Sequence, residues 1–315
     1  MKHFGMRATA MWVGAGSAAV VLLAAVPAAR ADVVEAEEVI VGEEIIEPVC
    51  VECPDKNSGR VNLSTGIDIT NAYFFRGILQ ERNGFIWQPY AELDFNLHQG
   101  DDPFTSWELA LGIWNSVQSE QTLAEPNHPA EWYELDAYAG LATNVYGPLG
   151  AGVTYIAYTY PNGSYATVQE IDATLELDDS ELLGAFSLQP SATFAFEVDG
   201  SNSLSGDESI YAELDVEPSY TFMQDSDYPV TLSAPLSLGL SLSDYYKPAG
   251  GSDDTFGFLS FGMGVGVPLG FVPENYGTWG VALGVNGLYL NDNLAAVNEG
   301  DNLYPVGTFS LTLDY

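Results

Sequence analysis

Residues 85–98 read Phe-Ile-Trp-Gln-Pro-Tyr-Ala-Glu-Leu-Asp-Phe-Asn-Leu-His, and this stretch decides the fold. Apolar side chains occupy every second position from Phe85 to Leu97, and mostly polar ones occupy the alternate positions from Gln88 to His98. Successive side chains of a β-strand point to opposite faces, whereas a helix would spread this pattern around its surface. The stretch therefore predicts a strand with one apolar and one polar face.

The same alternation recurs from Arg60 to the last residue. Most of the repeating segments have ten or more residues, which favours membrane strands of about 9–11 residues over soluble strands of about 5–6. The pattern predicts an all-β fold, a transmembrane antiparallel up-and-down β-barrel of about 12 strands over residues 60–315. The segments are 60–70, 85–98, 105–115, 131–143, 149–160, 165–177, 184–198, 208–222, 229–243, 255–268, 277–290 and 303–315.

The connections between these segments alternate in length. An even-stranded barrel with both chain ends in the periplasm has long outer loops and short inner turns in this order. Only the outer connection 161–164 departs from the trend. The longer connections are 71–84, 116–130, 199–207, 244–254 and 291–302, and the shorter ones are 99–104, 144–148, 178–183, 223–228 and 269–276.

The first residues have the features of an export signal. Lys2 and Arg7 give a positive start, the run 11–26 is apolar, and Ala29-Arg30-Ala31 is a small-x-small cleavage site. We expect removal of residues 1–31 rather than their retention as a membrane anchor. Residues 32–59 are acidic and lack an apolar repeat, so we expect a mobile periplasmic leader. The expected location is the bacterial outer membrane.

Two cysteines, Cys50 and Cys53, stand in Cys-Val-Glu-Cys within this leader. In an oxidising compartment a local disulfide is the first interpretation. A thioredoxin-like context and two further soft metal ligands are both missing, so the redox and zinc interpretations are weaker. The sequence also lacks a phosphate-binding loop and a dinucleotide fingerprint, and we expect no metal and no cofactor.

The charge is strongly acidic. All 44 Asp and Glu residues follow the expected cleavage site, against 5 basic residues. Such a chain repels nucleic acid. Its 47% hydrophobic content excludes disorder for the body of the chain. The acidity could serve function or adaptation to high salt, and the sequence leaves both open.

The last segment alternates apolar residues up to a terminal aromatic. Its members are Phe309, Leu311, Leu313 and Tyr315. This pattern resembles the C-terminal assembly signal of outer-membrane barrels. It implies the barrel-assembly machinery and outer-membrane lipid as partners.

The stretch from Thr70 to Gln80, Thr-Asn-Ala-Tyr-Phe-Phe-Arg-Gly-Ile-Leu-Gln, is followed by Gln88. It resembles the opening of the TorF-type porin family, which has Tyr-x-Phe-Arg-Gly-x-x-Gln after its first strand and a further Gln after the first loop. The similarity is specific over about thirty residues, and the chain is longer and more acidic than that pattern. The resemblance implies a porin-like outer-membrane protein without indicating a solute.

If the apolar faces meet lipid, the opposite faces line the lumen. A carboxylate-rich channel attracts cations and excludes anions, so we expect a water-filled, cation-preferring pore for small solutes or ions. The alternative is a bore plugged by tyrosines. The expected pore-lining acidic residues are Asp68, Glu92, Asp94, Glu108, Glu134, Asp136, Glu170, Asp172, Glu213, Asp215 and Glu217, and parity also places Glu176, Glu197 and Asp314 inside.

Arg76 is the one basic residue expected near the lumen, with Arg60 and Arg82 at the rims. It could line a constriction of the pore. Equally, it could pair with a lumenal carboxylate such as Glu92 and hold the first loop in place.

Three other classes of protein remain as alternatives. A non-conducting structural or adhesive barrel would use its long loops as a binding surface. An outer-membrane hydrolase would need a Ser/His pair, and only His98 and His128 follow the signal, neither in a nucleophile context. We expect no enzyme. A secreted soluble β-sandwich is the third alternative and would not depend on detergent.

Overall fold

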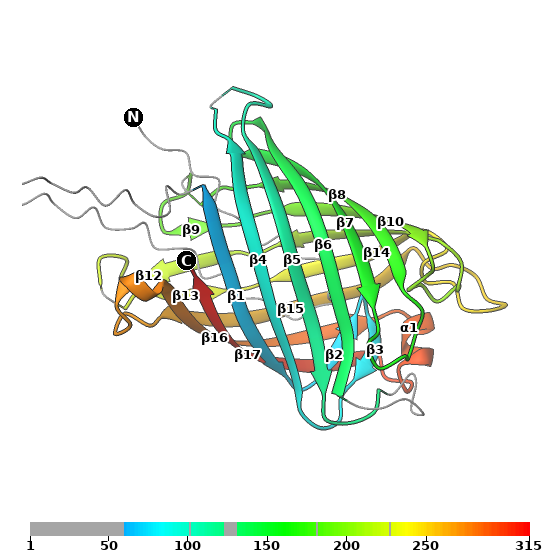
Figure 1. Ribbon diagram of the computed structural model, residues 1–315. Coiled ribbons are helices and arrows are strands. Elements are labelled where there is room, and N and C mark those ends of the chain that lie inside the picture. The colour runs from blue at the N-terminus through cyan, green and yellow to red at the C-terminus, as the bar shows by residue number, and fades with distance from the viewer. Residues whose placement is uncertain (1–59, 101, 123–130, 181, 227) are drawn as a thin grey trace, which may run out of the picture.

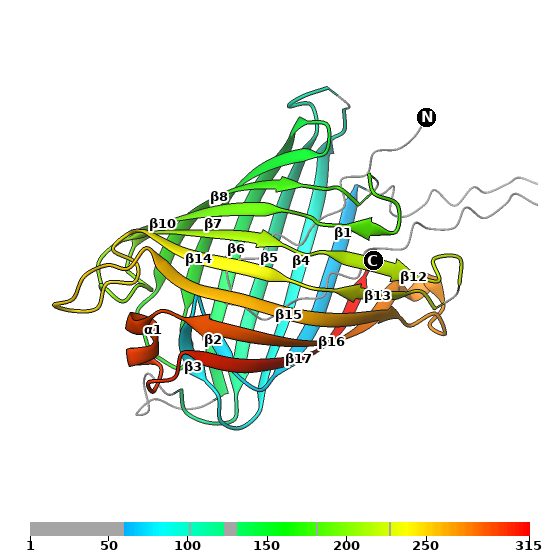
Figure 2. The same cartoon turned by 180° about the vertical axis from the view of Figure 1, so that it is seen from behind.

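The computed structural model describes residues 60–315 except 101, 123–130, 181 and 227. Its wall is a closed antiparallel barrel of 12 strands (Figures 1 and 2). The predicted fold class and strand number are therefore confirmed. The wall segments are β1 (Val61–Thr70), β4 (Ile86–His98), β5 (Trp107–Gln118), β6 (Glu131–Tyr146), β7 (Leu149–Thr159), β8 (Val168–Leu177), β9 (Phe186–Ser187), β10 (Ser191–Asp199), β11 (Ile210–Val216), β12 (Ser219–Phe222), β13 (Val230–Ser233), β14 (Leu236–Ser243), β15 (Phe256–Pro268), β16 (Thr278–Leu290) and β17 (Leu303–Asp314).

Two pairings close the ring. β1 pairs with β4 on one side and with β17 on the other, so that the first and last wall strands meet. β15 pairs with β16 on one side and with both β13 and β14 on the other. Beyond the end of β17, Tyr315 still exchanges two backbone hydrogen bonds of 2.7 and 2.8 Å with Leu63. A barrel closed in this way leaves no unpaired sheet edge in the hydrocarbon.

Three neighbouring wall strands are each interrupted once, where the sequence predicted continuous strands. The breaks contain Pro190, Pro218 and Pro235. Each proline lacks an N–H group, so the ladder loses a hydrogen bond there and the strand is interrupted. Backbone hydrogen bonds continue across the breaks, for example from Ala234 N to the Pro218 carbonyl at 2.8 Å. The segment pairs β9 and β10, β11 and β12, and β13 and β14 therefore each act as one wall strand.

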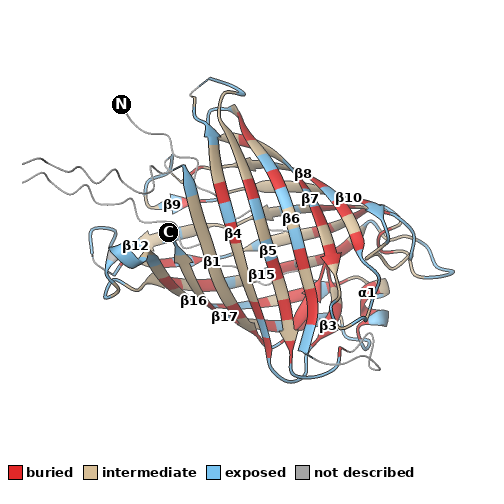
Figure 3. Ribbon diagram, viewed as in Figure 1, coloured by how far each residue is buried: buried red, intermediate tan, exposed pale blue. Residues whose placement is uncertain are grey.

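The two faces of the wall differ as the alternation predicted (Figure 3). On β4, Leu93 is 39% exposed and its neighbour Asp94 is 1% exposed. On β16, Leu283 and Val285 are exposed, whereas Asn286 is buried. Large apolar side chains thus cover the outside and polar ones point inward. An outer surface of this kind is suited to lipid, and the fold is that of an outer-membrane barrel.

The structure adds elements that the alternation did not predict. β2 (Tyr73–Phe75) and β3 (Ile78–Glu81) form a separate two-stranded sheet within the first long connection. A short helix, α1 (Asp292–Val297), and a 3-10 turn, η1 (Glu274–Tyr276), lie in two later connections. Figures 1 and 2 place β2, β3 and α1 at the same end of the barrel. We call this the loop end, and the opposite end, where β17 finishes, the turn end.

Within the described part of the chain, no helix has the length and apolarity needed to cross a membrane.

Candidate functional site in the lumen

The hairpin formed by β2 and β3 turns at Arg76 and Gly77. Both residues have positive φ angles, 47° and 83°, as a two-residue type I′ turn requires. A Cβ atom at Gly77 would lie only 2.8 Å from Leu294 Cδ1. Glycine is therefore required at this position both by the backbone and by the packing against α1.

The hairpin lies across the lumen and contacts opposite sides of the ring. The Phe74 ring packs against Tyr304 of β17, with ring centroids 5.0 Å apart. The Phe75 ring faces the other way and meets Tyr158 of β7 at 5.4 Å. Since β7 and β17 are far apart in the ring order, the hairpin fills the bore between them.

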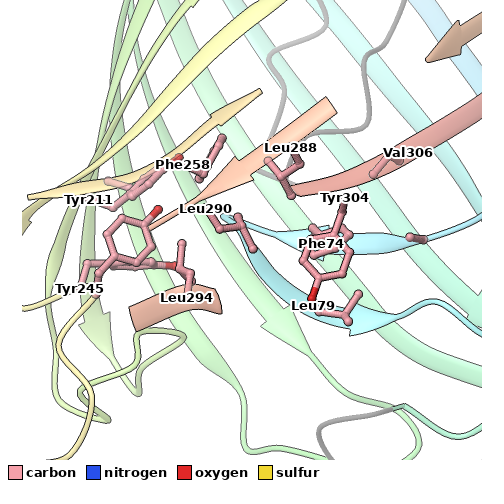
Figure 4. Close-up of a cluster of buried hydrophobic side chains, with 13 residues drawn as sticks. Phe74, Leu79, Tyr211, Tyr245, Phe258, Leu288, Leu290, Leu294, Tyr304 and Val306 are labelled. Atoms are coloured by element: carbon pink, nitrogen blue, oxygen red, sulfur yellow. The ribbon is translucent and has the colours of Figure 1, made fainter. Parts of the chain in front are cut away.

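Two buried apolar clusters hold the two faces of the hairpin. The α1-side cluster, shown in Figure 4, comprises Ala72, Phe74, Leu79, Ala195, Tyr211, Tyr245, Tyr246, Phe258, Leu288, Leu290, Leu294, Tyr304 and Val306. The β5-side cluster comprises Tyr73, Phe75, Ile86, Trp114, Tyr133, Ile156, Tyr158 and Val168. Apolar and aromatic side chains from the inward-folded first loop therefore occupy the loop-end half of the bore, where the sequence left open either a water-filled pore or a bore plugged by tyrosines.

Arg76, at the tip of the hairpin, is 1% exposed and binds Glu170 on β8. Its Nη1 and Nη2 atoms donate to the two carboxylate oxygens at 2.7 and 2.6 Å. The prediction that Arg76 pairs with Glu92 is wrong. Glu92 lies on β4, while the tip of the hairpin reaches the opposite wall. Of the two roles left open for Arg76, pairing that fixes the first loop is the one observed.

Aromatic rings and phenols complete the surroundings of the guanidinium. Its Cζ atom lies 4.3 Å from the centroid of Tyr211 and 5.5 Å from that of Tyr245. Burial alone would lower the pKa of Arg76, but Glu170 raises it well above the ordinary value. The guanidinium therefore stays charged, stabilised by a bidentate carboxylate and by cation–π contacts.

Polar side chains from the loops also hold the hairpin. Asn298, which follows α1, accepts a hydrogen bond from Leu79 N at 2.8 Å and donates to the Gly77 carbonyl at 2.6 Å. The Tyr246 hydroxyl donates to the Arg76 carbonyl at 3.1 Å. On the other face, Tyr133 donates to the Gln80 side chain at 2.6 Å. The hairpin is therefore attached to wall and loops along its whole length.

The predicted acidic residues all lie on inward positions of the wall strands, but they differ in exposure. The buried ones are Asp68, Glu92, Asp94, Glu134, Asp136, Glu170, Asp172 and Glu197, the half-buried ones are Glu108, Glu176, Glu213, Asp215 and Glu217, and Asp314 is exposed at the turn end.

Hydroxyl groups satisfy some of these carboxylates. Tyr73 donates to Glu134 at 2.7 Å, Tyr158 donates to Glu170 at 2.8 Å, and Tyr211 donates to Glu213. Each of these phenols comes from the hairpin or from a strand near it. The loop-end half of the lumen is therefore an aromatic and carboxylate network.

Other buried carboxylate oxygens have no hydrogen-bond partner among the described residues. Both oxygens of Asp136 are in this state, and one oxygen each of Asp68, Glu92, Asp94, Glu108, Asp172 and Glu217. Buried acceptors of this kind need protons, water or cations. Within the described residues no three His, Cys, Asp or Glu side chains converge as a metal site would require.

The remaining predicted residues have different outcomes. Phe309, Leu311 and Leu313 lie on β17, and Tyr315 continues its pairing, while their role as an assembly signal stays a prediction. His98 is exposed at the end of β4. Arg60 is exposed before β1, and Arg82 binds Glu299 between loops. The signal, the leader with Cys50 and Cys53, and His128 lie outside the described residues.

Sequence reasoning missed several residues that hold the hairpin. Tyr245 and Tyr246 form an adjacent aromatic pair in an acidic connection, and that pair was a signal that could have been read. Asn298 gave no such signal, since it is one of several asparagines in the connection 291–302. Its role depends on a contact with residues more than two hundred positions away.

Comparison with known proteins gives a family and a set of distant barrels. Residues 55–236 match the family model described as "Bacterial protein of unknown function (Gcw_chp)". No curated protein matches in sequence. Among solved structures, the NanC porin has a TM-score of 0.39 at 10% identity, covering 81% of this chain and 98% of that one. CdiB from Acinetobacter baumannii has 0.37 at 12% identity, covering 81% and 60%, and OprB from Pseudomonas putida has 0.37 at 7%, covering 81% and 94%. Such TM-scores carry no functional argument, and the barrel assignment rests on the strand pairing itself.

Proposed function

The chain belongs to the Gcw_chp family of bacterial proteins of unknown function, and from its lumen we propose that it is a porin-like outer-membrane channel for small cations. Passage through this channel is passive and is limited by the hairpin of β2 and β3. The proposal also includes a cleaved export signal, insertion by the barrel-assembly machinery, and pore-lining roles for the lumenal carboxylates.

The observation that carries the proposal is the imbalance of charge inside the wall. Inward positions of the described strands hold many carboxylates, whereas Arg76 is the one basic side chain in the described part of the lumen. Glu170 already neutralises Arg76. A low-dielectric channel lined with uncompensated carboxylates concentrates cations and excludes anions. Buried carboxylate oxygens without protein partners, such as those of Asp136, support hydration or cation occupancy.

The hairpin explains how such a barrel can restrict flow. It fills the loop-end half of the bore and is held by the Arg76–Glu170 pair. Ions must pass around the hairpin or wait for it to move. We therefore expect a small or intermittent conductance in the intact protein and a larger one when the hairpin is removed.

The test is ion selectivity in planar bilayers under a KCl gradient. Two proteins are compared, the intact barrel and a variant in which a short Gly-Ser linker replaces residues 73–81. Tyr73 pairs with Glu81, so the hairpin ends lie close enough for such a linker. We expect cation-selective reversal potentials from both, with larger conductance from the variant. Anion selectivity in either protein contradicts the proposal.

A non-conducting structural barrel is the second candidate, and the filled loop-end half favours it. The hairpin-free variant separates the two candidates. If it folds, as judged by heat-modifiable migration on gels, yet conducts no ions, the protein is a structural barrel and the channel proposal fails.

We also propose that the chain is a TorF-type porin. The motif residues Tyr73, Phe75, Arg76, Gly77 and Gln80 build the hairpin. Gln88, the last residue of the motif, is buried on β4. The resemblance thus falls on the segment that fills the bore. The same hairpin in a solved member of that family would support the assignment, and an open first loop would oppose it.

A further inference from the structure

The side chain of Arg76 occupies a pocket that is built almost entirely by other parts of the chain. Glu170 and Tyr158 come from neighbouring strands β8 and β7, and Tyr211 comes from β11. Tyr245 comes from the connection between β14 and β15. Apart from Phe75, no residue of the hairpin contributes a ring or a charge to the guanidinium.

These pocket residues also make contacts that do not involve the Arg76 side chain. Tyr158 donates to Glu170 at 2.8 Å, and Tyr211 donates to Glu213. The backbone N–H of Tyr245 donates to Ser241 at 2.9 Å, and the Tyr245 carbonyl accepts from Leu204 N at 2.9 Å. Because these contacts do not include Arg76, they remain when its side chain is removed, and a pocket held by such contacts lowers the entropic cost of binding.

The pocket binds the far end of the guanidinium. Nη1 and Nη2 make the paired contacts to Glu170, and Nη1 also lies 3.4 Å from the Tyr245 hydroxyl. Nε, which carries the alkyl chain, has no hydrogen-bond partner among the described residues. The pocket therefore needs only the planar fork, and a free monosubstituted guanidinium presents the same fork.

We propose that this pocket is a binding site for guanidinium-bearing cations and that Arg76 is its tethered occupant. In the setting of the proposed channel, on which this reading rests, guanidinium solutes are the preferred substrate class. An ammonium group lacks the planar fork and stacks less well on an aromatic face, so it fits less well. The hairpin closes the bore by placing its own guanidinium where that of the solute binds.

The test is chemical rescue of Arg76→Ala. This substitution leaves Glu170 buried without its partner and opens space for a small cation. The full-length variant is refolded into detergent with methylguanidinium or methylammonium at equal ionic strength, below denaturing concentrations. The readouts are the folded fraction on gels and the unfolding temperature. Because refolding itself is a readout, a variant that fails to fold alone still gives a result.

We expect methylguanidinium to raise the folded fraction and the unfolding temperature of Arg76→Ala at roughly tenfold lower concentration than methylammonium. The matched control is Arg82→Ala, which removes a half-exposed arginine paired with Glu299 and gains nothing from the additive. The double variant Arg76→Ala with Glu170→Gln is not stabilised by methylguanidinium, because it lacks the carboxylate that binds the guanidinium. Equal effects of the two cations on Arg76→Ala, or equal rescue of Arg82→Ala, overturn the pocket.

The rescue experiment measures stability and needs no conductance. If neither cation rescues the variant, the proposal of a guanidinium pocket is refuted, and the proposal of a cation channel is unaffected. If methylguanidinium rescues the variant but the barrel conducts no ions, the pocket is a binding site and the proposal of a channel is refuted.

Discussion

Arg76 and Glu170 form the one ion pair in the described part of the chain whose two side chains are both buried, at 1% and 0% exposure. Arg76 belongs to a loop that folds inward, and Glu170 belongs to the wall. The pair therefore couples the position of the hairpin to the barrel itself. It acts together with the two apolar clusters and the hydrogen bonds of Asn298 that also hold the hairpin in the loop-end half of the bore.

Replacing Arg76 by alanine should destabilise the barrel strongly, because it leaves the Glu170 carboxylate buried and unpaired. Breaking a buried pair costs about 3–5 kcal/mol, whereas an exposed pair contributes about 0–1 kcal/mol. Arg82→Ala is the matched control, since the Arg82–Glu299 pair is about 40% exposed on both sides. Urea unfolding, monitored by tryptophan fluorescence, gives the loss of unfolding free energy in each variant. Equal losses in the two variants would refute the anchoring role of Arg76.

Gly77→Ala should loosen the hairpin. The left-handed backbone costs about 1–2 kcal/mol with a Cβ atom, and the 2.8 Å approach to Leu294 adds about 1–3 kcal/mol of overpacking. Gly147→Ala measures the cost of the left-handed backbone alone, because Gly147 also has a positive φ but nothing lies within 4 Å of its added Cβ. Unfolding free energies and channel open time are the measurements. If Gly147→Ala costs as much as Gly77→Ala, the packing of the hairpin against α1 is unimportant.

Asn298→Ala should free the hairpin from the last loop. It leaves the Leu79 N–H and the Gly77 carbonyl without partners, at about 1–3 kcal/mol for each buried group. The expected result is faster hydrogen exchange at the Leu79 amide. Asn302→Ala is the control, since within the described residues the Asn302 side chain donates to the Leu290 carbonyl at 3.3 Å and to the Asp292 carboxylate at 3.5 Å and has no hydrogen bond to the hairpin. Unchanged exchange at Leu79 in Asn298→Ala would show that the wall alone holds the hairpin.

Leu283→Arg tests the lipid-facing surface. Leu283 is 57% exposed near the middle of β16, where an arginine facing hydrocarbon costs about 2–4 kcal/mol. Val297→Arg introduces the same side chain at a 49% exposed position of α1, at the loop end. We expect Leu283→Arg to reduce the free energy of unfolding in liposomes and Val297→Arg to change it little. Similar small effects at both sites would place β16 outside the bilayer.

The strand segments could be predicted closely because alternation is a local property. The predicted segment 85–98 corresponds to β4, Ile86–His98. The polarity of each side chain indicates which face of the strand it lies on. The hairpin of β2 and β3 was not predicted. Its seven strand residues are mostly apolar on both faces, and a buried plug needs apolar side chains on both sides. Read locally, that composition looks like part of a long loop.

Periodicity within the sequence was thus sufficient to predict the barrel and the alternation of exposed apolar and buried polar residues along its wall strands. Only the tertiary structure decided that the first loop folds into the bore and that Arg76 binds Glu170 rather than Glu92. The physical reason is that all inward carboxylates carry the same local pattern. Which of them meets Arg76 depends on the register of every strand pair between β1 and β8 and on the depth of the hairpin.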